Sequence, residues 1–309
     1  MHSAAIRAAE LRSPFASQVG KKTGAHQNPA YLPVTPHPAQ AFAGDLDRGY
    51  RPAPVGGQRM GQDAVMRVQF VGSGDAFGSG GRWQTCIHLA AEGQVVLVDC
   101  GATSLTALKA QGLDPGNVGA VAVTHLHGDH FAGLPFLILD GQFSRRTSPL
   151  LVAGPPGIRA RLTEAMETLF PGSSRAGRRF PVEVTELGTD GTPAGLGAAT
   201  VRGWEVEHAC GAPPLALRVE LGGASFAYSG DTQWTPALAT PARGADLFAV
   251  EAYTFDRPVR YHLDYQTLLA HREEIRAHRV VLTHMSAAML SRLADAELPA
   301  AYDGMIIDL

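Results

Sequence analysis

The sequence predicts an α/β fold, a four-layer αββα sandwich in which two β-sheets pack face to face and helices cover the outer faces. Three observations lead to this prediction. Strand-like segments precede helix-like segments in each half of the chain, metal-binding residue types follow strand ends in both halves, and 45% of the residues are hydrophobic. Because the two halves share one loose pattern, we expect residues 66–309 to form one domain.

The first half is expected to begin with three strands and to end with helices. Residues 66–71 alternate apolar and polar side chains as a strand does, and a Glu92-Gly93 turn joins strands 84–90 and 94–99. A helix over 158–169 follows a Pro-Pro-Gly sequence, a common start signal. The other elements of this half are helix 104–111, strand 118–124, helix 131–142 and strand 150–153.

The second half changes pattern after Asp231, where strands begin to alternate with helices. Before that residue we expect four strands, near 180–186, 200–207, 214–221 and 224–229. After it we expect strand 245–251, helix 265–278, strand 280–283, helix 286–297 and strand 305–309.

Composition excludes several classes of function. The net charge of −3 gives no global attraction to nucleic acid or to anionic lipid. No apolar stretch reaches the roughly 18 residues that a membrane span needs. No charged-then-apolar signal peptide is present. We therefore expect a cytoplasmic protein without a membrane partner.

Residues 1–65 contain seven prolines and seven glycines without periodicity, which predicts a disordered leader or a start codon assigned too early. Met66 is then a plausible true start. The basic, serine-containing composition of residues 1–24 leaves an organelle transit peptide open as an alternative.

The cysteines are three and widely spaced, which disfavours a disulfide framework or a structural zinc site. Cys210 follows His208 by two residues and could approach a metal, although a free cysteine is more often a small buried hydrophobe.

Residues 125–130 read HLHGDH, which places three imidazoles and a carboxylate within six residues. Imidazole and carboxylate are good ligands for zinc and similar divalent metals, and this set exceeds the needs of one open catalytic site. The motif follows an apolar strand and precedes a helix-like run, so a rigid turn would hold the ligands. Further candidates follow strands elsewhere: Asp99, His208, Asp231, Glu251, His262 and His284.

The motif, with His208, SGDT at 229–232 and THMS at 283–286, resembles the metallo-β-lactamase superfamily. Within it, VGSGD at 71–75, LVDCG at 97–101 and GPPG at 154–157 resemble the ribonuclease Z-type branch, as does VEA at 250–252 with its following Thr-Phe. The likeness extends from Met66 to about Leu309.

The resemblance implies two divalent metal ions, with zinc expected and manganese as the alternative. His125, His127 and His208 would hold the first ion, Asp129, His130 and His284 the second, and Asp231 would bridge them. Two such ions typically lie about 3.5–4 Å apart and bring the pKa of a bound water to about 7.

The resemblance also implies that Glu251 orients His262 and that His262 donates a proton to the leaving oxygen. A positioned acid of this kind contributes a factor of about 10²–10⁴ in rate. The alternative is an exposed loop histidine. Asp99 is expected either to orient a metal-bound histidine or to cap its strand. The Gly-rich turn around Asp75 lacks the GxGxxG spacing, so nucleotide binding there is rejected.

The sequence thus predicts a dinuclear metal-dependent phosphodiesterase of the ribonuclease Z-like type. Water activated by the metals would attack phosphorus, Asp129 would assist as ligand and base, and His262 would protonate the leaving group. The alternatives are a metal-dependent lactonase or thioesterase-type ester hydrolase, which would not require Glu251 and His262, and a non-catalytic metal-binding member.

The expected substrate is an anionic small molecule or a short nucleic-acid phosphodiester. The arm with which ribonuclease Z grips tRNA usually lies between the positions of His208 and Asp231, but here 22 residues forming two strands fill that interval. Residues 141–180 hold seven arginines against two glutamates, which either attracts an anionic substrate or forms a solvated face. A homodimer is expected by analogy with the branch.

Overall fold

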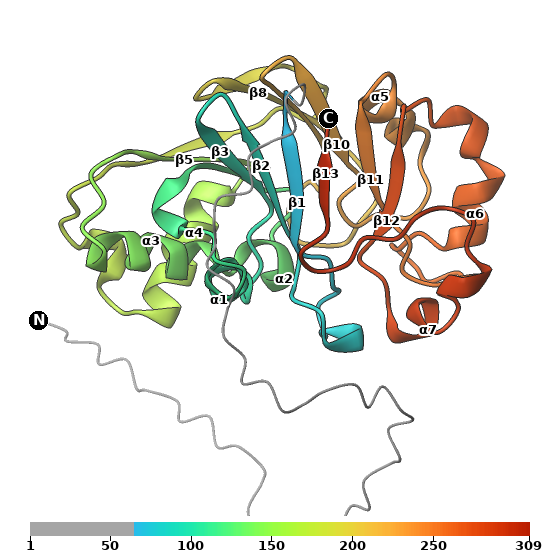
Figure 1. The fold of residues 1–309 in the computed structure, drawn as a ribbon. Coiled ribbons are helices and arrows are strands. Elements are labelled where there is room, and N and C mark those ends of the chain that lie inside the picture. Colours follow the sequence, from blue (N-terminus) through green and yellow to red (C-terminus); the bar gives the residue numbers. More distant parts are fainter. Residues whose placement is uncertain (1–64) are drawn as a thin grey trace, which may run out of the picture. The chain divides into compact units, whose positions relative to one another are not determined.

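The computed structural model describes residues 65–309. Apart from Val65, the predicted leader lies outside the described residues, and its assignment stays a prediction. Thirteen strands in the described part form two mixed sheets, and short helices flank them (Figure 1).

The first sheet has seven strands in the order β13-β1-β2-β3-β4-β5-β6. Pairing is antiparallel from β13 to β3 and parallel from β3 to β6. The strands are β1 (Arg67–Gly72), β2 (Cys86–Ala91), β3 (Gln94–Val98), β4 (Val118–Ala122), β5 (Leu150–Gly154), β6 (Val182–Glu186) and β13 (Ile306–Asp308).

The second sheet has six strands in the order β12-β11-β10-β9-β8-β7. Here β7 to β10 pair antiparallel, and β10, β11 and β12 run parallel. The strands are β7 (Ala194–Leu196), β8 (Ala199–Glu205), β9 (Leu215–Leu221), β10 (Ala224–Tyr228), β11 (Leu247–Glu251) and β12 (Val280–Thr283). Sequence analysis missed β7, because three residues are too few to show alternation.

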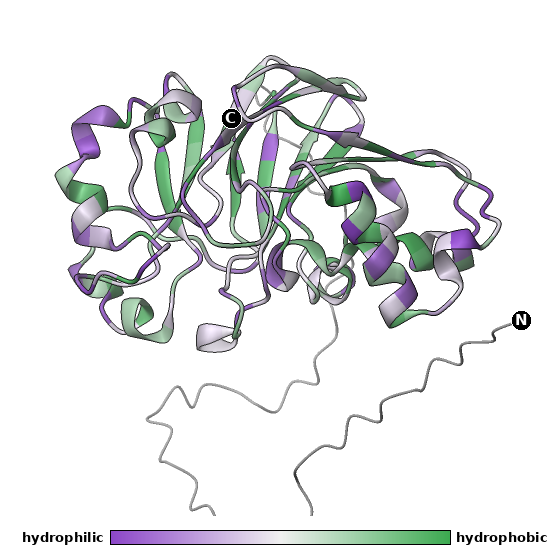
Figure 2. Ribbon diagram, turned by 180° about the vertical axis from the view of Figure 1, so that it is seen from behind, coloured by the Kyte–Doolittle hydropathy of each residue, from purple (hydrophilic) through white to green (hydrophobic). Residues whose placement is uncertain are grey.

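Three separate hydrophobic clusters define four layers. One lies between the sheets and joins side chains such as Phe70 of β1 and Phe226 of β10. Another packs the outer face of the first sheet against Leu108, Ile138 and other side chains of α1, α3 and α4. The third packs the second sheet against α5, α6 and α7. Figure 2 shows hydrophobic residues concentrated in the strands and polar ones on the outer sides of the helices. The predicted αββα sandwich is therefore confirmed.

Helix α4 has the predicted bounds, and α1 differs from its predicted bounds by one residue, but three other helices differ more. The α-helices are α1 (Ser104–Ala110), α2 (Gly128–Phe131), α3 (Leu134–Phe143), α4 (Ile158–Leu169), α5 (Ala239–Ala242), α6 (Tyr265–Ala270) and α7 (Ala287–Leu290). The 3₁₀-helices are η1 (Ser79–Gly81), η2 (Pro115–Asn117), η3 (Ser173–Arg175), η4 (Pro236–Leu238), η5 (Arg272–Glu274) and η6 (Leu293–Asp295).

Three predicted helices were too long, each for a physical reason. The helix expected over 131–142 is divided into α2 and α3, because Pro135 cannot donate a backbone hydrogen bond to the preceding turn. The helix expected over 265–278 ends at Ala270, since the backbone of Arg276 and His278 bonds to residues 244 and 245 beside β11. The helix expected over 286–297 ends at Leu290, and the Tyr265 hydroxyl accepts from the backbone N–H groups of 297 and 298.

Parallel pairing determines where the functional side chains lie. The carboxyl ends of β3 and β4 reach the same edge of the first sheet, and those of β10, β11 and β12 reach one edge of the second. Ligands in α/β sheets bind outside the carboxyl ends of parallel strands. Among the described residues, no helix combines the length and apolar character that a membrane crossing needs. The cytoplasmic location stays a prediction.

His88 of β2 should make the fold sensitive to acid. It is 9% exposed, and burial lowers the pKa of His88 to about 4. An unfolded chain takes up this proton near pH 6.5, so folding stability is lost as the pH falls from about 6.5 to about 4. We expect the free energy of unfolding, measured with urea, to fall between pH 7 and pH 4 in both wild type and His88→Gln. The fall should be larger in wild type by about 3 kcal/mol. Equal losses in both proteins would contradict this role for His88.

Candidate metal centre

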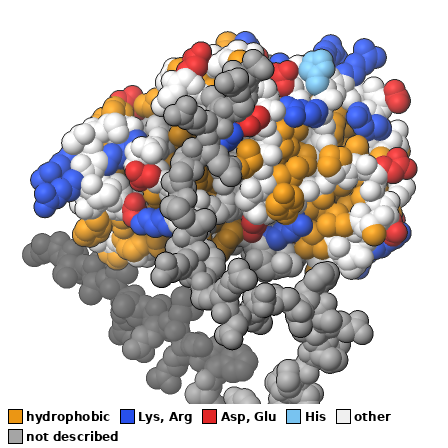
Figure 3. Space-filling model, viewed as in Figure 1, with side chains coloured by type: hydrophobic (Ala, Val, Ile, Leu, Met, Phe, Trp, Pro, Cys, Tyr) orange, Lys and Arg blue, Asp and Glu red, His pale blue; other side chains and the backbone are white. Residues whose placement is uncertain are grey.

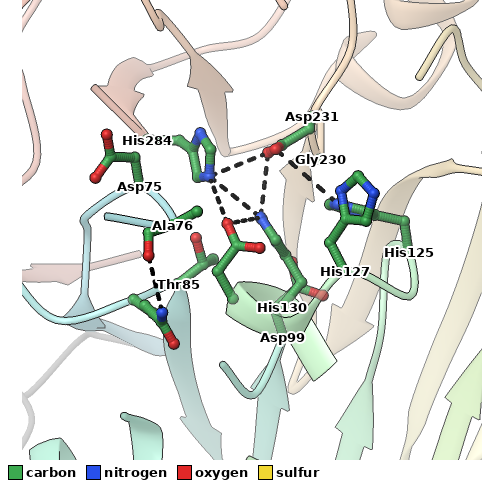
Figure 4. Close-up of polar contacts among 12 residues, drawn as sticks. Asp75, Ala76, Thr85, Asp99, His125, His127, His130, Gly230, Asp231 and His284 are labelled. Atoms are coloured by element: carbon green, nitrogen blue, oxygen red, sulfur yellow. Dashed lines mark hydrogen bonds and ion pairs between the residues drawn. The ribbon is translucent and has the colours of Figure 1, made fainter. Parts of the chain in front are cut away.

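Every residue that the sequence predicts as a ligand belongs to a cluster at the edge where the strand ends meet. Figure 4 shows five of them, His125, His127, His130, Asp231 and His284. His125 and His127 follow β4, and Asp129 and His130 lie on the short helix α2. The ligands distant in sequence come from the second sheet: His208 from the loop after β8, Asp231 from the loop after β10, and His284 from the residue after β12. The two sheets therefore each supply part of one cluster.

The three imidazoles predicted for the first ion form one group. The nitrogens of His125, His127 and His208 that face inward lie within 4.8 Å of one another, and His208 Nε2 lies 3.0 Å from His127 Nδ1. Nitrogens bound to one zinc ion at about 2.0–2.1 Å lie roughly 3–3.5 Å apart in a tetrahedral site. The spacing of this group therefore fits a single metal ion.

The residues predicted for the second ion form another group, which is almost fully buried. Asp129, His130, Asp231 and His284 place their ligand atoms within 4.8 Å of one another. His284 Nε2 lies 3.2 Å from His130 Nε2 and 3.2 Å from Asp129 Oδ2. This mixture of imidazole and carboxylate also suits a divalent ion.

Asp231 lies between the two groups. Its Oδ1 is 3.3 Å from His130 Nε2 in the second group, and its Oδ2 is 4.0 Å from His125 Nε2 in the first. Figure 4 shows the same arrangement, with His125 and His127 on one side of this carboxylate and His130 and His284 on the other. One oxygen facing each group is the arrangement that a bridging carboxylate requires.

Two inward-facing atoms of this cluster also lack a hydrogen-bond partner, although Asp231 Oδ1 has the ionic contact with His130. In the part of the chain that the structure describes, the buried His125 Nε2 and Asp231 Oδ1 accept or donate no hydrogen bond. A buried polar atom without a partner typically costs about 1–3 kcal/mol. Metal ions at this position would satisfy both atoms, so the residues present fit the predicted cofactors.

The charges in the cluster are strongly coupled. Burial lowers the pKa of His125 well below its ordinary value. Burial also opposes protonation of His130, but the carboxylates of Asp231 and Asp129 outweigh it and raise the pKa of His130 well above the usual range. In return, His284 and His130 overcome the effect of burial and hold the pKa of Asp231 well below its ordinary value. The buried carboxylates thus create a field that favours positive charge at this location.

Asp99 orients histidines of both groups. Its Oδ2 accepts from His130 Nδ1 at 2.6 Å and from the Thr124 hydroxyl at 2.8 Å. Because the Thr124 hydrogen is donated to Asp99, Thr124 Oγ1 accepts from His125 Nδ1 at 3.0 Å. Both imidazoles then turn Nε2 inward, as metal-bound histidines with such partners do. Asp99 also caps the end of its strand, which was the alternative expectation, because its Oδ1 accepts from the Thr124 backbone N–H.

The backbone at this edge is unusual. Asp99 and His284 both follow a strand and both have left-handed φ values, 60° and 54°. Such values are uncommon for residues other than glycine, and they concentrate at functional sites. Gly101 is required for a different reason, because a Cβ there would lie 2.2 Å from the Asp129 carbonyl oxygen. Helix α2, which carries Asp129, can approach the segment after β3 only over a glycine.

Glu251 and His262 form the predicted pair. Glu251 is fully buried at the end of β11, and its Oε1 accepts from His262 Nδ1. Its Oε2 accepts from the backbone of Thr232 at 3.0 Å and of Leu263 at 3.1 Å. Burial lowers the pKa of His262, but the hydrogen bond and charge of Glu251 outweigh it and raise that pKa above the ordinary value. Nε2 is the nitrogen left to meet a substrate.

Sequence reasoning missed two residues of the site. Thr124 precedes the HLHGDH motif directly, and a hydroxyl next to a ligand was the available signal. Tyr253 stacks on His262 with ring centroids 4.5 Å apart, and no sequence pattern distinguished it. Cys210 is not among the clustered groups of the described residues, and its thiol donates to the Ala212 carbonyl at 3.0 Å. The metal alternative for Cys210 therefore finds no support.

Comparisons with known proteins identify the family of the chain. The family model described as "Anti-Pycsar protein Apyc1" matches residues 66–297. A ribonuclease Z of Mycobacterium marinum is 34% identical over 194 residues, which cover 59% of this chain and 68% of the relative. A ribonuclease Z of Methanosarcina acetivorans is 26% identical over 272 residues, covering 72% of this chain and 88% of the relative.

Solved structures show the same fold. The short form of human tRNase Z superposes with a TM-score of 0.64 and 26% identity, covering 78% of this chain and 98% of that one. A diphosphatase of the PhnP family superposes with a TM-score of 0.65 at 19% identity, covering 79% and 98%, which supports the fold alone. The resemblance to the ribonuclease Z-like branch is confirmed. The chain belongs to the Anti-Pycsar protein Apyc1 family and is a metal-dependent phosphodiesterase with the metallo-β-lactamase fold.

Proposed function

We propose that the protein hydrolyses phosphodiesters with two divalent metal ions, with zinc expected and manganese as the alternative. His125, His127 and His208 would hold one ion, and Asp129, His130 and His284 would hold the other. The observation that carries the proposal is the position of Asp231, whose two oxygens face the two separate groups.

The residues of the chain have distinct proposed roles in the reaction. Bound divalent ions lower the pKa of a coordinated water and polarise a phosphoryl oxygen. Asp129 is proposed as a ligand and as the acceptor of a proton from the attacking water. His262 is proposed to donate the proton of Nε2 to the leaving oxygen, while Glu251 holds its ring and its tautomer.

The proposed substrate is a small anionic phosphodiester or a short nucleic-acid segment. The interval between His208 and Asp231 is occupied by β9 and β10, which pair directly and leave no residues for a gripping arm. On the face seen in Figure 3, basic side chains are mixed with acidic and hydrophobic ones. In the arginine-rich segment 141–180, the side chains of Arg146, Arg159 and Arg178 donate to backbone carbonyls, so part of their role is structural. These features disfavour an extended RNA substrate.

Metal content and turnover test the proposal together. We expect about two equivalents of zinc or manganese per chain by elemental analysis, and loss of bis(p-nitrophenyl) phosphate hydrolysis after chelation, restored by either metal. Stability should fall on chelation too, because the ions bind the folded state. A panel that includes a lactone and a thioester serves as control. If the protein hydrolyses the lactone or the thioester but no phosphodiester, it is an ester hydrolase instead. If it binds the metals but hydrolyses none of these substrates, the non-catalytic alternative is favoured.

A homodimer is proposed by analogy with this branch. Exposed aromatic and aliphatic side chains on adjacent helices support it: Phe136 and Phe143 on α3 and Leu169 on α4 are 36%, 83% and 44% exposed. Light scattering on the purified chain measures the mass directly, and a monomer at micromolar concentration would contradict this proposal.

A further inference from the structure

A pocket of about 440 Å³ lies beside the candidate metal centre and contains none of the predicted metal ligands. Three segments line it: residues 75–79 after β1, residues 253–259 after β11, and the start of α7. Ligand pockets in proteins commonly have volumes of about 300–1,000 Å³. This pocket is therefore large enough for a compact organic group but not for a folded nucleic acid.

Tyr253 connects the pocket to the site of chemistry. Its ring lines the pocket and also stacks on the imidazole of His262, with centroids 4.5 Å apart and an angle of 27° between the planes. The same ring lies 6.2 Å from that of His284. Tyr253 therefore contacts both the pocket and the proposed proton donor.

Phe77 lies at the exposed rim of the same pocket. Its side chain is 84% exposed, and its loop is held in place by the Asp75 carboxylate. That carboxylate accepts from the backbone N–H groups of Phe77 at 3.2 Å and Ser79 at 2.9 Å, and from the Ser79 hydroxyl at 2.7 Å. Exposed single hydrophobic residues are common. This one lies at a pocket that is also lined by Tyr253 and Phe255, so a ligand contact is the more economical explanation.

Three of the four charged side chains that line the pocket, those of Asp75, Asp256 and Arg292, have polar partners, and Arg257 is the fourth. Arg292 pairs with Asp256 at 2.6 Å and with Asp295 at 3.0 Å, and its guanidinium lies over the Phe255 ring at 3.8 Å. The carboxylate of Asp75 is used within its own loop. The pocket therefore offers aromatic faces more than net charge.

We propose that this pocket binds one ester group of the substrate, a flat aromatic ring, which contacts Phe77 and Tyr253 while the phosphate lies at the metal centre. The inference rests on the proposed function, because it needs a phosphate ester at that centre. It makes Phe77 a specificity-determining residue that favours aryl over alkyl phosphate esters. Aromatic pairs are worth about 0.5–1.5 kcal/mol beyond their buried area, which corresponds to a factor of roughly 2–13 in affinity.

Binding of phosphate monoesters to the zinc-loaded full chain tests the inference without turnover. Calorimetric titration should show phenyl phosphate binding about tenfold more tightly than methyl phosphate to wild type. In Phe77→Ala this preference should fall below about threefold, whereas Phe77→Trp should retain it. Cyclohexyl phosphate, which is similar in size but not flat, should bind more weakly than phenyl phosphate, because it buries apolar area without the aromatic contact.

Tyr302→Ala is the matched control, because Tyr302 is an aromatic residue that is 58% exposed and does not line the pocket. It should keep the wild-type preference, and metal content should be unchanged in all variants. The inference is overturned if wild type binds phenyl and methyl phosphate equally, if Phe77→Ala keeps the preference, or if no phosphate ester binds. If the protein prefers phenyl phosphate through Phe77 but hydrolyses no phosphodiester, the inference about the pocket holds and the proposed function is wrong.

Discussion

Replacing Asp231 by asparagine is expected to reduce phosphodiester hydrolysis by about 10³-fold or more and to lower the metal content. Asp231 is 3% exposed, and its two oxygens face His130 and His125 of the separate groups. An amide keeps the shape of the side chain but removes the negative charge and one of the two acceptor oxygens. One proposed ion therefore loses its oxygen ligand, and both lose the negative charge of the bridge, from a single substitution.

Elemental analysis and kinetics on the same preparation measure this effect. The control is Asp246→Asn, because Asp246 is also a partly buried carboxylate, which accepts from the backbone and the hydroxyl of Ser225 away from the centre. It should lose some stability but keep two metals and wild-type turnover. If Asp231→Asn retained both metals and full activity, the bridging role would be wrong.

Replacing His262 by alanine should have an effect that depends on the leaving group. For a diester with an alkyl leaving group we expect a rate loss of about 10²–10⁴, because an alkoxide leaves poorly without a proton. For bis(p-nitrophenyl) phosphate the loss should stay below about tenfold, since p-nitrophenolate leaves without general-acid help. Glu251→Gln should cause a smaller rate loss that depends on the leaving group in the same way, because the glutamine can still contact His262 Nδ1.

The chain contains a matched control for this pair. His271 bonds to Glu274 at 2.6 Å on the surface, which repeats the histidine–carboxylate contact away from the metal centre. His271→Ala should not change the rate of hydrolysis of either the alkyl diester or bis(p-nitrophenyl) phosphate. Equal losses of His262→Ala on alkyl and aryl leaving groups would exclude proton donation and leave His262 with a role in binding.

Much of the fold could be predicted because its signals are local. Alternation identified most strands, and Pro-Pro-Gly marked the start of α4 at Ile158, as observed. The ends of helices were harder to predict, since α6 and α7 stop where tertiary hydrogen bonds replace helical ones. Those bonds involve residues far apart in the chain, such as Tyr265 with residues 297 and 298. No pattern within a short window of sequence records such contacts.

The sequence by itself determined the ligand types and the close set at 125–130, because residues of one strand-to-helix turn must lie together whatever the remaining fold. Only the tertiary structure decided that His208, Asp231 and His284 meet that turn, since the parallel strands of two sheets must first bring their ends to one edge. The Thr124 hydrogen bond and the Tyr253 pocket likewise depend on packing. Ligand chemistry resides in residue types, whereas distances between remote strand ends are set by how the sheets pair and pack.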